Sequence, residues 1–214
     1  MKSLAFAADA PVRTVLCLGA HCDDVEIGCA GTLLQIQQRY PSAHFHWALM
    51  SGEPERVAET QSAARRLLGE QAVTVAVQPF RGSYLFAEAA AVKDYIETLK
   101  QLDPDVVFTH HLQDRHQDHR LIAEFTWNTF RNHFILEYEI PKFEGDLGHP
   151  NFYVPIPEAD LLRKLDALEA CFPSQRTRTW FTPETFRALM RIRGIECNAA
   201  SGYAEAFHAR KVTF

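Results

Sequence analysis

The feature that most constrains the fold is a regular alternation of short apolar runs with helical patterns in the first half of the chain. The apolar, β-prone runs occupy residues 14–20, 44–50, 73–77 and 105–109. Helical periodicity falls between them, over residues 29–39, 55–69 and 89–101. Strands that alternate with helices form βαβ units, in which successive strands run parallel. The sequence therefore predicts an α/β fold built on a mostly parallel sheet flanked by helices.

Beyond residue 119 the pattern changes. A long helix is expected there, because apolar residues recur at helical spacing, and Asp114 with Gln117 resembles an N-terminal cap and its return partner. Residues 134–157 are rich in proline and aromatic residues, which predicts extended segments and loops that either cover a site or contact another subunit. Helices return at 158–171 and 183–192. We therefore expect one domain, residues 1–214, with an elaborated C-terminal part.

Composition excludes several classes of protein. Hydrophobic residues make up 47% of the 214 residues, enough for a sizeable core, and the net charge of −5 comes without a basic stretch that would indicate nucleic-acid binding. No apolar segment approaches the roughly 18 residues of a membrane span, and Leu4–Ala8 is too short for a secretory core. Five cysteines without CxxC spacing favour a reducing compartment, so we expect a cytoplasmic protein.

Two polar clusters each follow a predicted strand. His21-Cys22-Asp23-Asp24 comes directly after the run 14–20, and Asp114-Arg115-His116-Gln117-Asp118-His119 follows the run 105–109. Open α/β sheets build their sites at the carboxyl ends of their strands. Each cluster alone could be a helix-capping turn or a solvated loop, but two such clusters in one chain favour a single metal site assembled from both.

The residue types suit a hydrolytic metal site. Such sites usually keep three protein ligands and one open position, and His21, Asp24 and His119 would supply two nitrogens and one oxygen. Zn²⁺ is the expected cofactor, although iron(II), cobalt or manganese suit the same ligands. Cys22 is a much weaker candidate ligand, because better-placed candidates flank it.

The polar residues of the two clusters that are not predicted ligands suggest catalytic roles. Asp23 remains a free carboxylate beside the metal, which is what a general base for an attacking water requires. His116 lies three residues before His119, so it can face the same cavity without binding the metal. Asp118 could hold His116 in one tautomer and raise its pKa.

These motifs resemble those of the PIG-L (LmbE-like) zinc-dependent deacetylases. Residues 19–33, with His21-Cys22-Asp23-Asp24 and the following glycines, are similar to the first family motif, Ala-His-Pro-Asp-Asp. Residues 116–119 are similar to the second, His-Pro-Asp-His. The helix around Arg56 and the ending 203–207 also match the family pattern, so the resemblance spans nearly the whole chain.

The resemblance implies a Rossmann-like fold and hydrolysis of an N-acetyl group, most often on an N-acetylglucosamine unit. It implies zinc binding by His21, Asp24 and His119. It further implies these roles: Asp23 as general base, His116 as oxyanion stabiliser, Asp118 as its orienting partner and Arg56 as a substrate contact. Cys22 and Gln117 replace the usual prolines, and Phe80–Tyr84 stands where relatives often have an aspartate.

The leading hypothesis is a zinc hydrolase that removes acetyl from an amino sugar or its conjugate, such as a nucleotide sugar, a glycoside or an antibiotic precursor. The alternatives are a metal amidase for a non-sugar amide and a non-catalytic metal- or ligand-binding module, against which the unused Asp23 argues. Weaker candidates for substrate contact are His111, Tyr138 and Glu205. The expected partner is a small molecule, and a homo-oligomer is possible.

Overall fold

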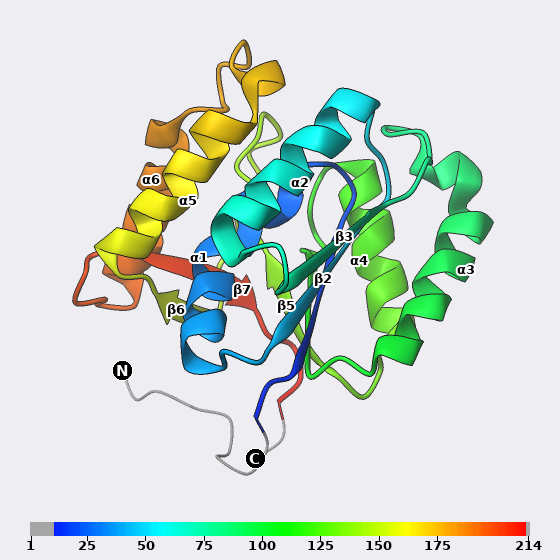
Figure 1. Ribbon diagram of the computed structural model, residues 1–214, viewed down its shortest axis with the longest axis horizontal. Helices are drawn as coiled ribbons and strands as arrows, with labels where there is room; N and C mark the ends of the chain where they lie inside the picture. Colours follow the sequence, from blue (N-terminus) through cyan, green and yellow to red (C-terminus); the bar gives the residue numbers. More distant parts are fainter. Residues whose placement is uncertain (1–10, 213–214) are drawn as a thin grey trace.

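The computed structural model describes residues 11–212 and contains one seven-stranded sheet in the order β3-β2-β1-β4-β5-β7-β6 (Figure 1). The segment Leu4–Ala8, expected to be an ordinary extension, lies outside the described residues. The strands are β1 (Thr14–Gly19), β2 (His44–Leu49), β3 (Val73–Val77), β4 (Val106–His110), β5 (Phe134–Tyr138), β6 (Phe152–Pro155) and β7 (Ala204–His208). The pairs among β1 to β5 are parallel, whereas β7 is antiparallel to both β5 and β6. The predicted mostly parallel α/β sheet is confirmed.

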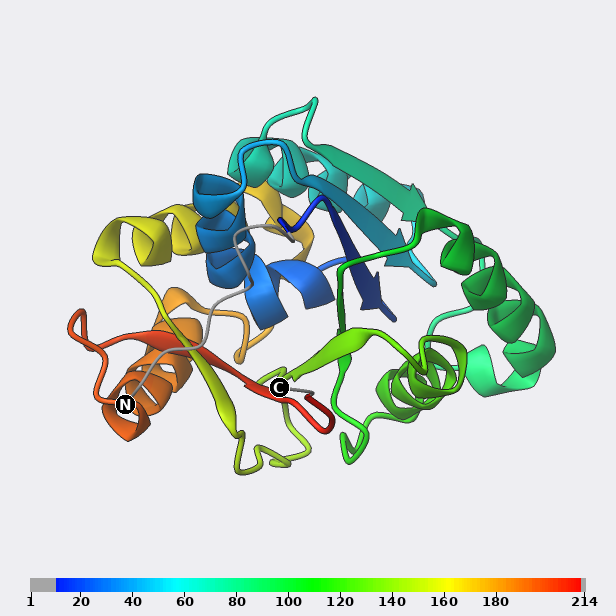
Figure 2. The same cartoon turned by 90° about the horizontal axis from the view of Figure 1, so that it is seen from below.

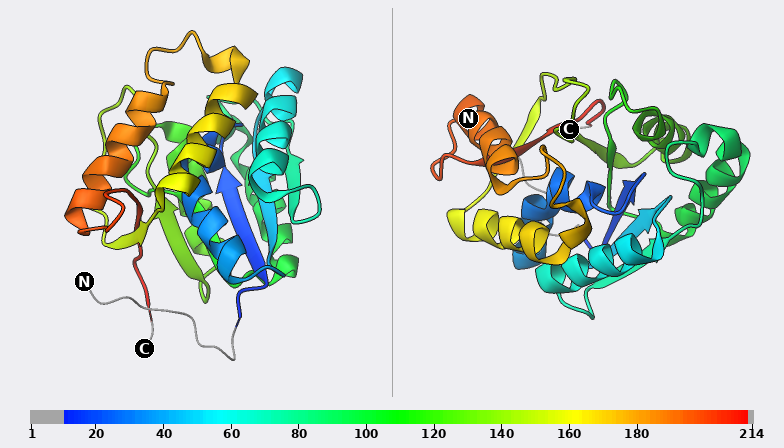
Figure 3. Two further views of the ribbon diagram at one scale, coloured as in Figure 1. Left: turned by 60° about the vertical axis from the view of Figure 1, so that its left-hand side comes forward. Right: turned by 90° about the horizontal axis from the view of Figure 1, so that it is seen from above.

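Helices cover both faces of this sheet. They are α1 (Asp24–Arg39), α2 (Pro54–Leu68), α3 (Ala89–Thr98), α4 (Gln117–Thr129), α5 (Glu158–Cys171) and α6 (Pro183–Glu196), with the 3₁₀ turns η1 (Leu85–Glu88), η2 (Leu99–Leu102) and η3 (Pro173–Gln175). Helices α1, α2 and α5 pack together on one face, and α3 and α4 lie on the other (Figures 2 and 3). Among the described residues, no helix combines the length and the apolar character that crossing a membrane requires.

The central strand β1 contributes to two separate cores, one on each face of the sheet. Val15 and Cys17 belong to the core under α1, α2 and α5, whereas Leu16 and Leu18 belong to the core under α3 and α4. Successive residues of a strand point to opposite faces, so a strand covered on both sides reads as one continuous apolar run. This is why residues 14–20 show no polar alternation.

The predicted element boundaries are close, with one important exception. Helix α2 ends before Gly69, whose φ of 83° is the left-handed conformation that glycine adopts readily at a helix end. Helix α1, in contrast, begins at Asp24 rather than at residue 29. The helical apolar pattern is weak in its first turn because polar residues of the site occupy it. The segment 134–157 is only partly loop, since it supplies β5 to the interior of the sheet and β6 to its edge.

Candidate metal centre

The two polar clusters meet at the carboxyl edge of the sheet. Strands β1 and β4 are direct neighbours and run parallel, with Cys17 opposite Phe108. Their chains therefore leave the sheet at the same level, and the loops that follow carry the two clusters toward each other. Beyond β1 the chain enters α1 at Asp24, and beyond β4 it enters α4 at Gln117.

Side-chain atoms of three residues, at or next to the starts of α1 and α4, come together in a compact triangle. His21 Nδ1 lies 3.3 Å from His119 Nε2 and 3.6 Å from Asp24 Oδ2, and His119 Nε2 lies 3.6 Å from Asp24 Oδ1. Tetrahedral ligands about 2.0–2.1 Å from a zinc ion are separated from one another by about 3.3–3.4 Å. The spacing of the predicted ligands His21, Asp24 and His119 therefore suits a zinc-sized ion.

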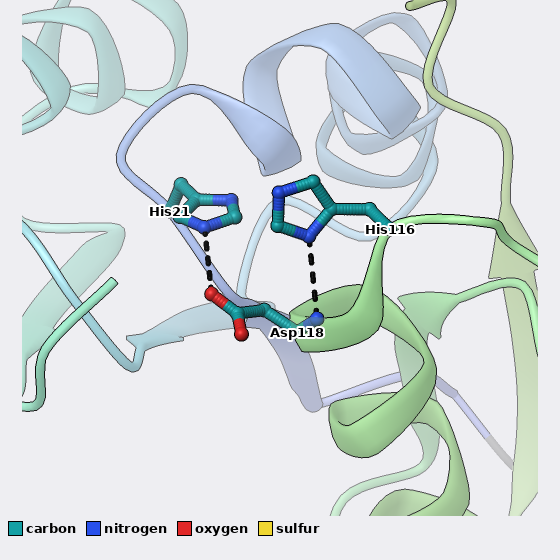
Figure 4. A group of neighbouring side chains, drawn as sticks. All are labelled: His21, His116 and Asp118. Atoms are coloured by element: carbon teal, nitrogen blue, oxygen red, sulfur yellow. Dashed lines mark hydrogen bonds and ion pairs between the residues drawn. The ribbon is translucent and has the colours of Figure 1, made fainter. Parts of the chain in front are cut away.

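The remaining ring nitrogens of the two histidines are held by carboxylates. His119 Nδ1 lies 2.9 Å from Asp114 Oδ2. His21 Nε2 lies 3.2 Å from Asp118 Oδ2, as Figure 4 shows. A carboxylate accepts a hydrogen bond, so each of these nitrogens carries the ring proton. The lone pairs of His21 Nδ1 and His119 Nε2 then face each other across 3.3 Å. Such an arrangement favours a cation between the rings and is the usual environment of metal-binding histidines.

The electrostatic environment of these three residues also favours a bound cation. Burial and the neighbouring His110 lower the pKa of His119 to about 3, which keeps that imidazole neutral. Burial also lowers the pKa of His21, but the hydrogen bond to Asp118 and the charge of Asp24 outweigh it and raise that pKa. The surrounding carboxylates thus attract positive charge to the space beside His21.

Two other groups of potential ligands overlap with this one, namely His21/His116/Asp118 and His110/Asp114/His119. Their carboxylates already accept several hydrogen bonds. Asp118 accepts the N–H groups of Ser83 and Leu85 besides the His21 bond. Asp114 accepts the His116 N–H and the His119 bond, and pairs with Lys142 Nζ at 2.9 Å. Asp24 also accepts a hydrogen bond, from the His21 backbone N–H at 2.7 Å, so what distinguishes the group His21/Asp24/His119 is the pair of histidine nitrogens that face each other across 3.3 Å.

Asp114 does not cap α4, so that prediction is wrong. The N-cap residue is His116, whose Nδ1 accepts the Asp118 N–H at 3.2 Å. Asp114 instead binds His119. Burial alone would raise the pKa of Asp114, but the hydrogen bond to His119 and the nearby positive charge of Lys142 outweigh it, so the pKa of this carboxyl lies well below its usual range. The signal in the sequence was an aspartate five residues before a candidate ligand, which we read as a helix cap.

The predicted partnership of Asp118 and His116 also needs correction. The Asp118 carboxylate pairs with His21, and only its backbone N–H contacts His116 (Figure 4). The pKa of His116 is lowered, not raised, by burial and by the nearby His21. Because His116 Nδ1 accepts a hydrogen bond, the neutral ring carries its proton on Nε2, where it can be donated.

Asp23 lies next to the predicted ligand Asp24 but has a different partner. Its Oδ2 is 2.8 Å from Arg56 Nη2, and Arg56 also pairs with Glu59 at 3.1 Å and donates to the Cys22 carbonyl. Burial raises the pKa of Asp23 to about 6 although Arg56 opposes the shift, and the charge of Asp24 adds to it. Arg56 thus orients the predicted base, and its predicted contact with substrate stays a prediction.

Two of the weaker candidates for substrate contact, Tyr138 and Glu205, are buried and hydrogen-bonded to other parts of the protein. The Tyr138 hydroxyl donates to the Leu18 carbonyl, and the ring packs so closely on α1 that a Cβ at Gly28 would lie 2.4 Å from it. Glu205 is paired with Lys164 at 2.6 Å and accepts the N–H groups of Gly31 and Thr32. These partners give no support to the predicted contacts with a substrate.

The side chains of His111 and Cys22 also have partners within the protein. His111 Nδ1 lies 2.6 Å from Glu137, and its ring stacks on His208 at 3.8 Å, so its predicted substrate contact remains untested. The Cys22 thiol is buried against the Ser51 carbonyl, and burial raises its pKa. A thiol that stays protonated is a poor metal ligand.

His110 is a site residue that our reasoning from the sequence did not assign to the centre. Its ring stacks on His119 with centroids 3.8 Å apart, and its Nε2 lies 3.0 Å from Asp24 Oδ2 and from the Ala20 nitrogen. It therefore fixes both a histidine and a carboxylate of the triangle. Its position as the last residue of β4 was the available signal.

Comparison with known proteins gives the fold independent support. The N,N'-diacetylchitobiose deacetylase of Pyrococcus horikoshii superposes with a TM-score of 0.71 at 20% identity, over 96% of this chain and 87% of that chain. GalB, the 4-carboxy-2-hydroxymuconate hydratase of Pseudomonas putida KT2440, superposes with a TM-score of 0.74 at 16% identity, over 94% and 98%. The shared fold therefore serves both a deacetylase and a hydratase and does not by itself select a reaction.

Sequence similarity is more specific than the fold. The protein described as uncharacterized deacetylase YaiS of Escherichia coli K12 is 29% identical over 139 residues, which are 61% of this chain and 75% of that protein. The family model PIG-L, GlcNAc-PI de-N-acetylase, matches residues 16–130, just over half of the chain, including both polar clusters. The chain therefore belongs to the PIG-L family of de-N-acetylases.

Proposed function

We propose that this protein is a zinc-dependent N-deacetylase that hydrolyses the acetamide of an amino sugar or of its conjugate. The observation that carries the proposal is the pair of facing lone pairs on His21 Nδ1 and His119 Nε2, each fixed by a carboxylate on the opposite side of its ring. Membership of a de-N-acetylase family supports the reaction type. His21, Asp24 and His119 would hold the ion.

A bound zinc ion supplies Lewis acidity, which polarises a carbonyl oxygen and lowers the pKa of water. Asp23 takes the proton of the attacking water on a carboxylate oxygen while Arg56 holds that carboxylate in one orientation. The proton then passes from Asp23 to the departing amine nitrogen as the C–N bond breaks, so that the products are acetate and the free amine. His116 donates its Nε2 proton in a hydrogen bond to the oxygen that becomes negative.

The test is acetate release from a panel of N-acetylamino sugars, by protein stripped with a chelator and then reloaded with zinc. We expect activity only after reloading. Asp23→Asn should keep stoichiometric zinc but lose about 10²–10⁴-fold in turnover, since a general base is removed. His119→Ala should lose the metal itself, measured by elemental analysis of dialysed protein.

Glu59→Gln is the matched control for Asp23→Asn, because Glu59 is the other buried carboxylate paired with Arg56. It should retain turnover within a fewfold. Wild-type turnover by Asp23→Asn would exclude Asp23 as the base. Hydrolysis of simple N-acetyl amides but of no sugar in the panel would favour the amidase alternative.

A further inference from the structure

The segment Phe80–Phe86, a loop that follows β3 and runs into the first residues of η1, lies against the candidate metal centre. A Cβ placed on Gly82 would lie 3.7 Å from Cδ2 of the ligand His21 and 3.0 Å from Ser51 Oγ. The backbone at Gly82 therefore comes so close that a single methyl group there would touch the His21 ring. This is the segment where the sequence departs from the aspartate common in the family.

The loop is held rigidly by the same carboxylate that orients His21. Asp118 accepts the N–H groups of Ser83 at 2.5 Å and Leu85 at 3.3 Å, and Gln117 Nε2 donates to the Ser83 carbonyl at 3.1 Å. Ser83 adopts a left-handed φ of 66°, which is unfavourable for a residue with a side chain. A strained residue that is kept in place by several hydrogen bonds is a frequent mark of a functional segment.

This rigid loop presents two large aromatic rings to solvent. Tyr84 is 45% exposed and Phe86 is 59% exposed, with ring centroids 6.1 Å apart. The Arg81 guanidinium covers part of the Tyr84 ring, 4.0 Å from its centroid. Exposed apolar surface next to a reaction centre is typical of a ligand-binding surface.

We propose that Tyr84 and Phe86 form a stacking subsite for a second sugar ring, one joined to the ring that carries the acetamide. This inference rests on the proposed function. One face of a pyranose ring consists of C–H groups, which suit the negative face of an aromatic ring, while its hydroxyls suit the N–H donors of Arg81. Tyr84 lies between Ser83 and Leu85, whose N–H groups both bind the carboxylate that holds His21, so the subsite would adjoin the candidate metal centre.

The experiment compares N-acetylglucosamine with N,N'-diacetylchitobiose as substrates of the zinc-loaded enzyme. Tyr84→Ala and Phe86→Ala should each lower kcat/KM for the disaccharide about tenfold, mainly through KM, because truncating an aromatic contact costs about one decade of affinity. The monosaccharide should be unaffected within about twofold, a range smaller than one weak contact. Tyr84→Phe should behave like the wild type, since stacking needs the ring and not the hydroxyl.

Ile195→Ala is the matched control, because Ile195 is a comparably exposed apolar side chain at the end of α6. Calorimetric binding of chitobiose, the fully deacetylated disaccharide, is measured in parallel and decides the subsite even if neither substrate is hydrolysed. Weaker binding by the two alanine variants supports the subsite. Equal binding by the wild type and the variants, or an equal loss for both substrates, would overturn it, whereas failure to hydrolyse either sugar counts against the proposed function alone.

Discussion

Two regions of this molecule bury several charged groups, and they differ in how those groups are paired. Between α5, β7 and α1, Lys164 pairs with Glu205 and also donates to the Ile27 carbonyl at 2.6 Å. Nearby, Arg193 forms a two-pronged ion pair with Glu139, at 2.9 and 2.7 Å. Each of these four charges meets its opposite, so we interpret this region as structural.

The candidate metal centre contrasts with this region. There the ring protons point outward to Asp114 and Asp118, and the lone pairs point inward to a shared space. Burying unpaired acceptors is costly unless a cation joins them. The comparison shows that buried charged groups alone do not identify a metal site. Side chains whose lone pairs face one another across a shared space are the more specific sign.

The largest effect is expected for Lys164→Met, which tests whether the Lys164–Glu205 pair stabilises the fold. It leaves the Glu205 carboxylate buried without its cation, so the free energy of unfolding should fall by about 3–5 kcal/mol. Urea denaturation measures the change, and zinc affinity should stay as in the wild type. Arg163→Met is the control on the same helix, because its ion pair with Asp160 is half exposed and should contribute less than about 1 kcal/mol. Similar losses for both variants would contradict the assignment.

A smaller effect is expected when a carboxylate that holds a ligand loses its charge. Asp114→Asn weakens the hydrogen bond to His119 Nδ1, and zinc affinity should fall about 10–100-fold. Competition with a chromophoric chelator measures it. Asp146→Asn is matched, since Asp146 also pairs with Lys142, at 2.7 Å, but touches no predicted ligand. If both variants bound zinc as tightly as the wild type, Asp114 would have no part in holding the ligand.

The smallest effect is expected at His208, which stacks on His111 outside the metal centre. Burial and the neighbouring His111 lower the pKa of His208 to about 4. Its unfolded value is about 6.5, so between these values the unfolded chain binds more protons and stability falls as the pH is lowered. His208→Gln should flatten the dependence of the unfolding free energy between pH 6.5 and 4, measured by denaturant titration at several pH values. His149→Gln, at an exposed loop position, should keep the wild-type slope, and an unchanged slope in His208→Gln would refute the expectation.

The ligand candidates and the fold class could be predicted because both depend on short stretches of chain. Apolar runs that end in polar clusters place His21 and Asp24 after one strand and His119 after another, and parallel neighbours bring such ends together. The pairing of carboxylates with histidines could not be predicted this way. It depends on where α4 starts, and the N-cap proved to be His116, which freed Asp114 to hold His119.

Tyr138 and Glu205 show most clearly what cannot be predicted from the sequence. Both are polar residues near recognised motifs, and in the sequence they are indistinguishable from residues that face a substrate. Glu205 is buried because β7 brings it against α1, 173 and 174 residues away in the chain, where it accepts two backbone N–H groups. Sequence by itself determined which chemical groups follow the ends of the strands, because an apolar run and the polar cluster after it are local features of the chain. Only the tertiary structure decided which of those groups face one another and which are buried among partners, because that depends on contacts between distant segments.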